Sequence, residues 1–197
     1  PHLGHRRIQI DDAGIWGVSY DGFPQSAIVR RRGETGSERV TLTFDDGPDP
    51  DWTPHILDIL RDEGVQAAFF VTGARAIRNP DLVRRIVAEG HEIGNHTFTH
   101  ADLANAGPLR VKLELNATQR AIENITGRSS LLFRPPYDAD RTPHRLREVE
   151  PLILAQELGY IPTMASIDPL DWQTPPAGQI LERIRRDRPA GRVILLH

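Results

Sequence analysis

From residue 40 to residue 197, one arrangement recurs along the chain: a short apolar run, a polar loop, and then an amphipathic stretch. Several apolar runs are rich in Val, Ile, Phe and Thr, as β-strands are, and the amphipathic stretches carry apolar residues at helical spacing. Alternating strands and helices predict a parallel sheet, open or closed into a barrel. Such folds place their chemistry in loops beyond the C-terminal ends of the strands, so we expect functional residues there.

The same pattern sets the expected elements. Residues 1–38 do not follow it, apart from one strand expected at 15–20, and we interpret them as an N-terminal extension or a linker from an upstream region. Helices are expected at 53–63, 80–89, 109–125, 143–158 and 179–186, and a glycine soon after four of them favours a helix stop. Strands are expected at 40–44, 67–72, 92–96, 131–135, 161–167 and 192–196.

Composition narrows the chemistry. The chain has no cysteine, which removes disulfides and thiolate zinc sites and leaves His, Asp and Glu as possible metal ligands. The formal net charge is -3, so the overall balance does not indicate a nucleic-acid or anionic-membrane partner. No apolar run is long enough to span a membrane, and the first residues show no signal-peptide pattern.

Two adjacent carboxylates, Asp45 and Asp46, follow the first apolar run of the pattern. Adjacent residues of a strand point to opposite sides, so the two acids are expected to have different tasks. That separation argues against the facing carboxylate pair of a glycosidase. Taken alone, the two acids also fit a plain Asp-rich turn, because Asp-Gly and Gly-Pro sequences favour turns.

Two histidines, His96 and His100, stand four residues apart where the strand at 92–96 ends. They would meet on one face if the segment were a helical turn, which is a common metal-binding geometry. In isolation, two solvated surface histidines are the simpler interpretation. With Asp46 they make two imidazoles and one carboxylate, and three protein ligands with an open position is the pattern of a catalytic zinc site.

Three further segments place polar or aromatic residues after predicted strands. Arg134 opens a proline-rich loop that ends at Tyr137, and an arginine there can hold a carboxylate by a two-pronged contact. Asp171 and Trp172 follow the next strand; a tryptophan face can bind a sugar, although tryptophan is more often part of a core. His197 follows the last apolar run. Alone, each segment also fits a surface turn or a chain end without a role.

Taken in order, the five segments resemble the catalytic motifs of the polysaccharide deacetylases of carbohydrate esterase family four, which include chitin, chitooligosaccharide and peptidoglycan deacetylases. The resemblance implies a distorted (β/α) barrel with fewer regular strands than the eight-fold form. It also implies a metal-dependent hydrolase that removes N-acetyl groups from an N-acetylglucosamine-containing polysaccharide or oligosaccharide. The matching segments are Thr-Phe-Asp-Asp-Gly-Pro from Thr43, His-Thr-Phe-Thr-His from His96, Arg-Pro-Pro-Tyr from Arg134, Asp-Pro-Leu-Asp-Trp from Asp168 and Leu-Leu-His from Leu195.

The resemblance further implies roles for the residues of the reacting centre. Asp46, His96 and His100 would be the metal ligands, for zinc or another divalent ion such as cobalt. Asp45 would act as the general base that takes a proton from water. His197 would act as the general acid that protonates the leaving nitrogen, a task that suits a side chain with a reference pKa of about 6.5.

Five more residues receive supporting roles by the same resemblance. Arg134 would orient the base aspartate and hold it ionised, and the backbone N–H of Tyr137 would bind the oxyanion. Asp171 would stand beside the acid histidine and raise its pKa. Tyr137, Trp172 and Pro136 would line the groove that binds the sugar.

Three departures from the family pattern stand out. Asp138 occupies a position where the family often has glycine, which changes the expected turn and the sugar-side contacts. The segment 138–156 is somewhat long, so one wall of the groove is expected to be unusual. The sequence stops at His197, where the family continues, so we expect residues 39–197 to be a catalytic domain truncated at its C-terminus.

Other interpretations stay open at this point. One is a hydrolase on a related barrel that acts on another amide, an imide or an O-acetyl group. A second is a catalytically inactive carbohydrate-binding domain, and a third is a structural domain of a larger protein. The expected partner is a carbohydrate polymer or oligosaccharide and not nucleic acid, with room for further domains in the parent chain. By resemblance, we expect an extracytoplasmic location, either secreted, periplasmic or facing the cell exterior.

Overall fold

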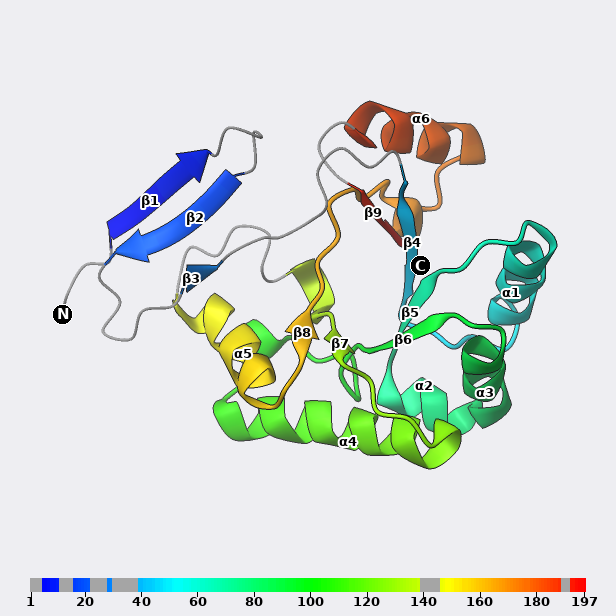
Figure 1. Ribbon diagram of the computed structural model, residues 1–197, viewed down its shortest axis with the longest axis horizontal. Coiled ribbons are helices and arrows are strands. Elements are labelled where there is room, and N and C mark those ends of the chain that lie inside the picture. Colours follow the sequence, from blue (N-terminus) through cyan, green and yellow to red (C-terminus); the bar gives the residue numbers. More distant parts are fainter. Residues whose placement is uncertain (1–4, 11–15, 22–27, 30–38, 139–145, 189–191) are drawn as a thin grey trace. The chain divides into compact units, whose positions relative to one another are not determined.

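The computed structural model describes residues 5–10, 16–21, 28–29, 39–138, 146–188 and 192–197 (Figure 1). The chain divides into two compact units, Pro1–Arg39 and Val40–His197. The first unit holds three antiparallel strands in the order β1 (His5–Ile10), β2 (Trp16–Asp21) and β3 (Ile28–Val29). The strand expected at 15–20 is therefore present as β2, while the interpretation of residues 1–38 as an extension or linker stays a prediction.

The second unit is built on a six-stranded sheet in which every neighbouring pair is parallel. A strand lies at each of the six predicted positions, in the spatial order β8-β7-β6-β5-β4-β9. The two strands at one edge are only two residues long. The strands are β4 (Thr41–Asp45), β5 (Ala68–Val71), β6 (Glu92–Asn95), β7 (Leu132–Phe133), β8 (Ile161–Pro162) and β9 (Val193–Leu196).

The sheet curls until its two edges are connected by one short segment of chain. The prediction of one continuous strand at 161–167 is wrong, because only Ile161–Pro162 pair with β7. The chain then crosses to the opposite edge, where Ile167 forms a parallel bridge with Ile194 of β9. The Leu195 N–H donates to the carbonyl of Ile167 at 2.9 Å. This closure, with helices outside the sheet, gives the distorted (β/α) barrel that the sequence predicts.

Six helices belong to this unit among the described residues, and five of them were predicted. The missed one, α2, follows β5 directly and is too short to show a helical period in the sequence. Residues 139–145 lie outside the described residues, so neither the start of the helix predicted at 143–158 nor the expected long segment from 138 can be compared. The helices are α1 (Thr53–Asp62), α2 (Gly73–Arg78), α3 (Pro80–Ala88), α4 (Pro108–Thr126), α5 (Leu146–Glu157) and α6 (Ala177–Asp187).

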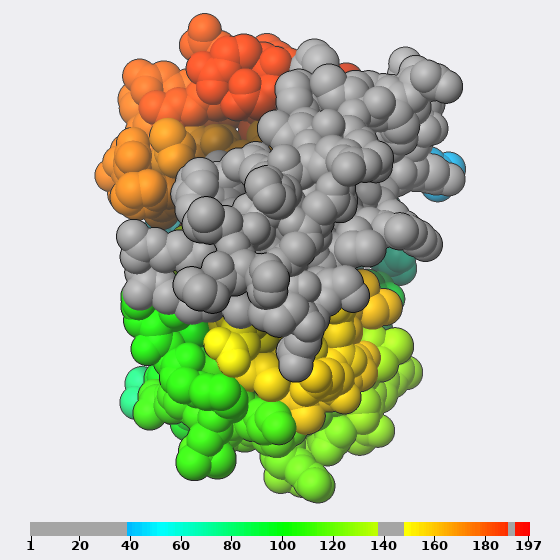
Figure 2. Space-filling view, turned by 90° about the vertical axis from the view of Figure 1, so that its left-hand side faces the viewer, coloured from blue at the N-terminus to red at the C-terminus, as the bar shows by residue number. Residues whose placement is uncertain are grey.

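Two apolar clusters attach the helices to the sheet. In one, Leu57 of α1 and Ile86 of α3 pack with Val71 of β5. In the other, Leu115 of α4 packs in one cluster with Phe133 of β7 and with residues of α5. Figure 2 shows α5 in yellow beside α4 in green. Each such side chain stabilises the fold by about 1.5–3 kcal/mol relative to exposure. None of the described helices is both long and apolar enough to cross a membrane.

Candidate active site

Polar side chains gather at the carboxyl ends of the parallel strands. Asp45 is the last residue of β4, His96 directly follows β6, Arg134 directly follows β7 and His197 directly follows β9. Because carboxyl ends of parallel strands meet at one edge of a barrel, these residues come from distant parts of the sequence to one place.

Asp46, His96 and His100 form a cluster whose ligand atoms all lie within 4.8 Å of one another. Oδ1 of Asp46 lies 3.2 Å from Nε2 of His96 and 3.0 Å from Nε2 of His100. His96 is buried, whereas the side chains of Asp46 and His100 are partly exposed. The cluster is therefore open on one side and closed on the other, as a metal site that must admit a substrate requires.

The backbone brings these three side chains together in a way that the sequence did not predict. Residues 96–100 form a loop and not the predicted helical turn, with φ of 65° at Thr97 and 58° at His100. Asp46 has a φ of 70°, so the strand alternation expected for the two acids ends at this residue. As a result both Asp45 and Asp46 approach His96, at 3.8 and 3.2 Å from Nε2.

The hydrogen bonding of His96 tests whether a cation fits the cluster. Its Nδ1 lies 2.8 Å from the backbone carbonyl of Arg134, which can only accept, so Nδ1 carries a hydrogen. In the neutral ring, Nε2 then presents a lone pair to Asp46. Oδ1 of Asp46 is itself buried and has no aligned hydrogen-bond donor among the described residues. A metal ion bound by these acceptors would satisfy both atoms, so the residues present fit a divalent metal.

The electrostatics at Asp46 also fit a bound cation. Burial raises the pKa of its carboxyl, but the imidazoles of His100 and His96 outweigh burial and hold that pKa well below its usual range. Asp46 is therefore a carboxylate that needs a positive partner between itself and the two rings. That partner is either a proton on a ring nitrogen or a metal ion.

Asp45 belongs to a different network, centred on Arg134. Nη1 of Arg134 donates to Oδ1 of Asp45 at 2.7 Å and to Oγ1 of Thr43 at 2.7 Å, and Nε donates to the carbonyl of Thr163 at 3.0 Å. Burial raises the pKa of Asp45, and His96, Arg134 and His197 offset only part of that rise. Arg134 acts in the expected direction, but burial is the larger influence on the pKa of Asp45.

The guanidinium of Arg134 also packs against the aromatic ring of Phe70. The guanidinium carbon of Arg134 stands 4.1 Å from the centre of the Phe70 ring, which is within the range of a cation–π contact. The same ring lies against Gly94, where an added Cβ would come within 2.3 Å of Phe70 Cδ1. A glycine at this point of β6 therefore makes room for the ring on which Arg134 rests.

His197 and Asp171 form a third pair. Nδ1 of His197 lies 2.9 Å from Oδ1 of Asp171, and the backbone N–H of His197 donates to Oδ2 at 2.6 Å. Burial lowers the pKa of His197, but the hydrogen bond and charge of Asp171, with the charges of Asp46 and Asp45, raise it overall. Burial conversely raises the pKa of Asp171, and the bonds and charge of His197 lower it overall.

The predicted sugar-binding residues differ in exposure. Tyr137 is 67% exposed, has a φ of 65°, and places its ring edge-on to His100 at 4.7 Å between centres. Trp172 is 57% exposed in a short 3-10 helix that starts at Asp171. Both rings can therefore meet a ligand. Pro136 is buried, which leaves its ring little surface for the sugar contact expected of it.

The sequence profile of the polysaccharide deacetylase family matches residues 32–152. The chain belongs to the polysaccharide deacetylase family. The matched span includes Asp45, the three residues of the Asp46 cluster, Arg134 and Tyr137, and it ends before Asp171, Trp172 and His197. The first group of residues thus lies within the recognised part of the family pattern.

Similar proteins place the chain among polysaccharide deacetylases along most of its length. The chitooligosaccharide deacetylase of Sinorhizobium fredii is 38% identical over 166 residues, which are 84% of this chain and 74% of that protein. The solved structure of the Bc1960 peptidoglycan N-acetylglucosamine deacetylase superposes with a TM-score of 0.75 at 34% identity, covering 82% of this chain and 72% of that one.

A third likeness is to a family member without activity. The structure of BA3943, a CE4 family pseudoenzyme from Bacillus anthracis, superposes with a TM-score of 0.75 at 26% identity and covers 96% of this chain and 66% of that one. Polysaccharide deacetylase family membership therefore does not by itself establish turnover. Turnover depends on the individual side chains at the carboxyl ends of the strands.

Several residues of this polysaccharide deacetylase site were missed in the sequence. Thr43 was placed in the first motif but received no role, and Phe70 and Gly94 read as ordinary strand residues, because their contacts with Arg134 or its ring neighbour are long-range. Asn95 is fully buried and accepts from the N–H of Thr97 at 2.9 Å. Glu114 of α4 was also missed. The one sign of it in the sequence is a charged residue at a position on the buried face of an amphipathic helix, because charged residues are rarely fully buried without partners.

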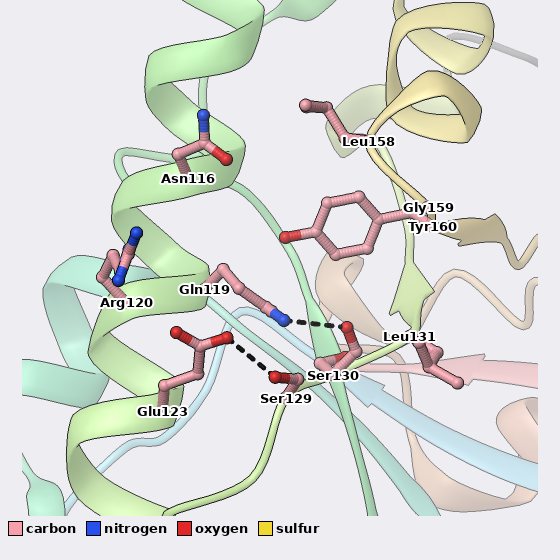
Figure 3. A pocket seen from close by; sticks show the side chains of 10 residues that line it. All are labelled: Asn116, Gln119, Arg120, Glu123, Ser129, Ser130, Leu131, Leu158, Gly159 and Tyr160. Atoms are coloured by element: carbon pink, nitrogen blue, oxygen red, sulfur yellow. Dashed lines mark hydrogen bonds between the residues drawn. The ribbon is translucent and has the colours of Figure 1, made fainter.

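A pocket elsewhere on the molecule contains none of these residues. Figure 3 shows it between α4 and the two loops that precede β7 and β8. It therefore lies at the amino ends of those strands, opposite to the end where the polysaccharide deacetylase motifs meet. Its polar groups come mainly from α4, where Gln119 donates to the carbonyl of Ser130 at 3.1 Å.

Proposed function

We propose that this protein is a metal-dependent hydrolase that removes N-acetyl groups from an N-acetylglucosamine-containing oligosaccharide or polysaccharide. The observation that carries the proposal is the acceptor cluster of Asp46, His96 and His100. Beside it stand a buried carboxylate, Asp45, and an imidazole, His197, which are suited to move protons. Metal ligands, base and acid are all present, which favours an enzyme over an inactive binding domain.

Asp46, His96 and His100 would hold the metal, and zinc is the first choice because two imidazoles and a carboxylate are typical zinc ligands. Cobalt is an alternative for the same donor set. A divalent metal supplies Lewis-acid chemistry, in which it polarises a carbonyl oxygen and makes water more acidic. The hydrogen bond from His96 to the carbonyl of Arg134 fixes the ring nitrogen that faces the metal.

Asp45 is the proposed general base. It lies 3.8 Å from Nε2 of His96, at the edge of the metal cluster, and Arg134 fixes one of its oxygens. The second oxygen is then directed toward the cluster, where it can accept a proton from the attacking water. The raised pKa of Asp45 strengthens it as a base, because proton transfer is most efficient when the base pKa approaches the working pH.

His197 is the proposed general acid. An amine leaves poorly unless it is protonated, so amide cleavage needs a group that is charged near neutral pH and can give its proton away. The Asp171 carboxylate holds Nδ1 of His197 and raises the pKa of the ring, which keeps Nε2 protonated. As Asp171 holds Nδ1, Nε2 is the atom free to donate to the leaving nitrogen.

The remaining roles concern the substrate. The Tyr137 backbone N–H would stabilise the charge on the former acetyl oxygen, and one such donor is typically worth about 3–4 kcal/mol. The exposed faces of Tyr137 and Trp172 would bind sugar rings. A chitooligosaccharide or a peptidoglycan strand is the expected substrate class, as the names of the similar proteins suggest. An extracytoplasmic location, where such polymers occur, is part of this proposal.

The test is acetate release from N-acetylglucosamine oligomers by metal-stripped protein with and without added zinc. Zinc-dependent release supports the proposal. Protein that binds zinc but releases no acetate from chitooligosaccharide or peptidoglycan would instead favour a domain like the BA3943 pseudoenzyme. Release of acetate only from O-acetylated sugars would replace the amide substrate by an ester.

A further inference from the structure

The loop between the two histidine ligands is held in a conformation that needs external support. Two of its residues, Thr97 and His100, have positive φ although neither is glycine. Each such residue costs of order 1–3 kcal/mol and persists only where its surroundings fix it. The contacts that fix this loop therefore also set the separation of the His96 and His100 rings.

Part of the support comes from the loop's neighbours in sequence and from α2. Oδ1 of Asn95 accepts the N–H of Thr97 at 2.9 Å. The first amides of α2 donate to the loop carbonyls, Gly73 to Thr97 and Ala74 to Phe98, both at 3.0 Å. The carbonyls of Thr97 and Phe98 thus have partners, but the two amides in the middle of the loop need an acceptor from elsewhere.

Glu114 of α4 supplies that acceptor. Its Oε2 accepts the N–H of Phe98 at 2.7 Å and the N–H of Thr99 at 2.8 Å. Its Oε1 accepts the hydroxyl of Thr99 at 2.7 Å and pairs with Arg110 at 2.6 Å. One carboxylate therefore holds both consecutive amides that lie midway between the two histidines.

A carboxylate is the side chain that this position requires. The donors around Glu114 are two amides, a hydroxyl and a guanidinium, and only an ionised acid offers acceptors on both of its terminal atoms. Glu114 is 3% exposed, and burying a charge is costly unless it is fully hydrogen-bonded. Burial raises the pKa of Glu114, but the bonds from Thr99, Phe98 and Arg110 outweigh it and keep the group ionised.

We propose that Glu114 is a positioning residue for the metal centre, which fixes the loop between His96 and His100 so that both rings face Asp46. The inference rests on the proposed function, because it assigns Glu114 a task only if these residues bind a metal. Outer partners of metal ligands typically change metal affinity by about 10–100-fold when they are removed. Glu114 acts through the loop backbone and touches neither ring.

The experiment measures zinc affinity by competition with a chromophoric chelator in wild type, Glu114→Gln and Glu114→Leu. Glutamine keeps one acceptor oxygen, so we expect it to weaken zinc binding by about 10-fold. Leucine keeps none, and we expect a loss of about 100-fold. The matched control is Val83→Ala, a fully buried residue of α3 whose loss lowers the melting temperature without touching the loop.

A purely structural role for Glu114 predicts a different outcome. Both Glu114 variants would then melt earlier but bind zinc as tightly as Val83→Ala at the same loss of stability, and the inference would be overturned. The visible spectrum of the cobalt-loaded protein gives a second readout, which should change in Glu114→Gln and not in Val83→Ala. If Glu114→Leu does not fold, Glu114→Gln alone decides. Wild-type protein that binds no divalent metal would overturn the proposed function first, and this inference with it.

Discussion

Arg134 donates a hydrogen bond of 2.7 Å to Asp45, and both side chains are almost completely buried. The pair joins the carboxyl end of β7 to the carboxyl end of β4. Removing one member of a buried ion pair typically costs about 3–5 kcal/mol, because the other charge is left without a partner. The pair therefore fixes Asp45, the proposed general base, in place, and replacing either residue should destabilise the site.

Asp45→Asn should abolish turnover and leave metal binding largely intact. Asparagine keeps an oxygen that can accept from Arg134 but cannot take a proton from water. Because a general base typically contributes about 10²–10⁴-fold, kcat should fall by at least that range. Acetate release and the zinc content of the purified variant are the two measurements. Loss of zinc together with activity would contradict the separation of roles between Asp45 and Asp46.

Zinc should stabilise the metal-stripped protein against heat, and Asp46→Asn should remove that effect. A ligand at one hundred times its Kd stabilises the folded state by about 2.7 kcal/mol. The measurement is the melting temperature as a function of zinc concentration. The control is Asp49→Asn, an acid of the same loop that holds the N–H of Asp51 at 2.9 Å and lies outside the ligand cluster. An equal zinc response in wild type and Asp46→Asn would remove Asp46 from the ligand set.

Asp171→Asn should move the basic limb of the kcat pH profile to lower pH. The raised pKa of His197 means that the pair stabilises the folded state fully below the unfolded histidine value of about 6.5. That stabilisation is lost as pH rises through the raised folded pKa. The lowered pKa of Asp171 sets the acidic limit of this stabilisation. The stability that the Asp171 carboxylate contributes to the folded state is lost as pH falls through its lowered pKa. Without the carboxylate, His197 loses its proton at lower pH.

Asp168→Asn is the matched control for this profile. Asp168 lies in the same predicted motif, but its Oδ1 accepts the N–H of Leu170 at 2.8 Å, whereas the contacts with His197 come from Asp171. The basic limb of its profile should stay at the wild-type position. An equal shift in both variants would mean that the net charge of the segment, and not the Asp171 contact, sets the pKa of His197.

The strand and helix positions could be predicted from the sequence because they depend on local periodicity. Leu57 and Leu60 of α1, for example, are both buried, as their spacing predicts. The candidate metal ligands could be located because Asp46 and His96 directly follow predicted strands and His100 stands four residues after His96. The family motifs then added their roles, which periodicity alone could not supply.

The supporting contacts could not be predicted, because they join residues far apart in the chain. Glu114 reaches the histidine loop from α4, and its place on the buried face of that helix beside Leu115 does not say which groups it contacts. The conformation of that loop was missed for a related reason. Positive φ at Thr97 and His100 runs against local preference and is held by tertiary hydrogen bonds. The crossing of the chain from β8 to Ile167 likewise depends on β9, which comes later in the sequence.

Gly94→Ala should lower both the stability of the protein and its kcat. The added Cβ would lie 2.3 Å from Cδ1 of the Phe70 ring, so the ring must move, and Arg134 stands 4.1 Å from the centre of that ring. We expect a loss of about 1–3 kcal/mol in unfolding free energy, the usual cost of overpacking. We also expect a lower kcat with zinc still bound, because the displaced Arg134 no longer fixes Asp45.

A double-mutant cycle with Phe70→Leu separates this mechanism from general damage to the sheet. Leucine removes the ring edge that the new Cβ would strike, so the two substitutions together should cost less than the sum of each alone, by at least 0.5 kcal/mol or so for residues in contact. Gly178→Ala in α6 is the control, since nothing lies within 4 Å of the added Cβ there and the change should be neutral or stabilising. Strict additivity of Gly94→Ala and Phe70→Leu in urea unfolding would show that the Phe70 ring does not transmit the effect to Arg134.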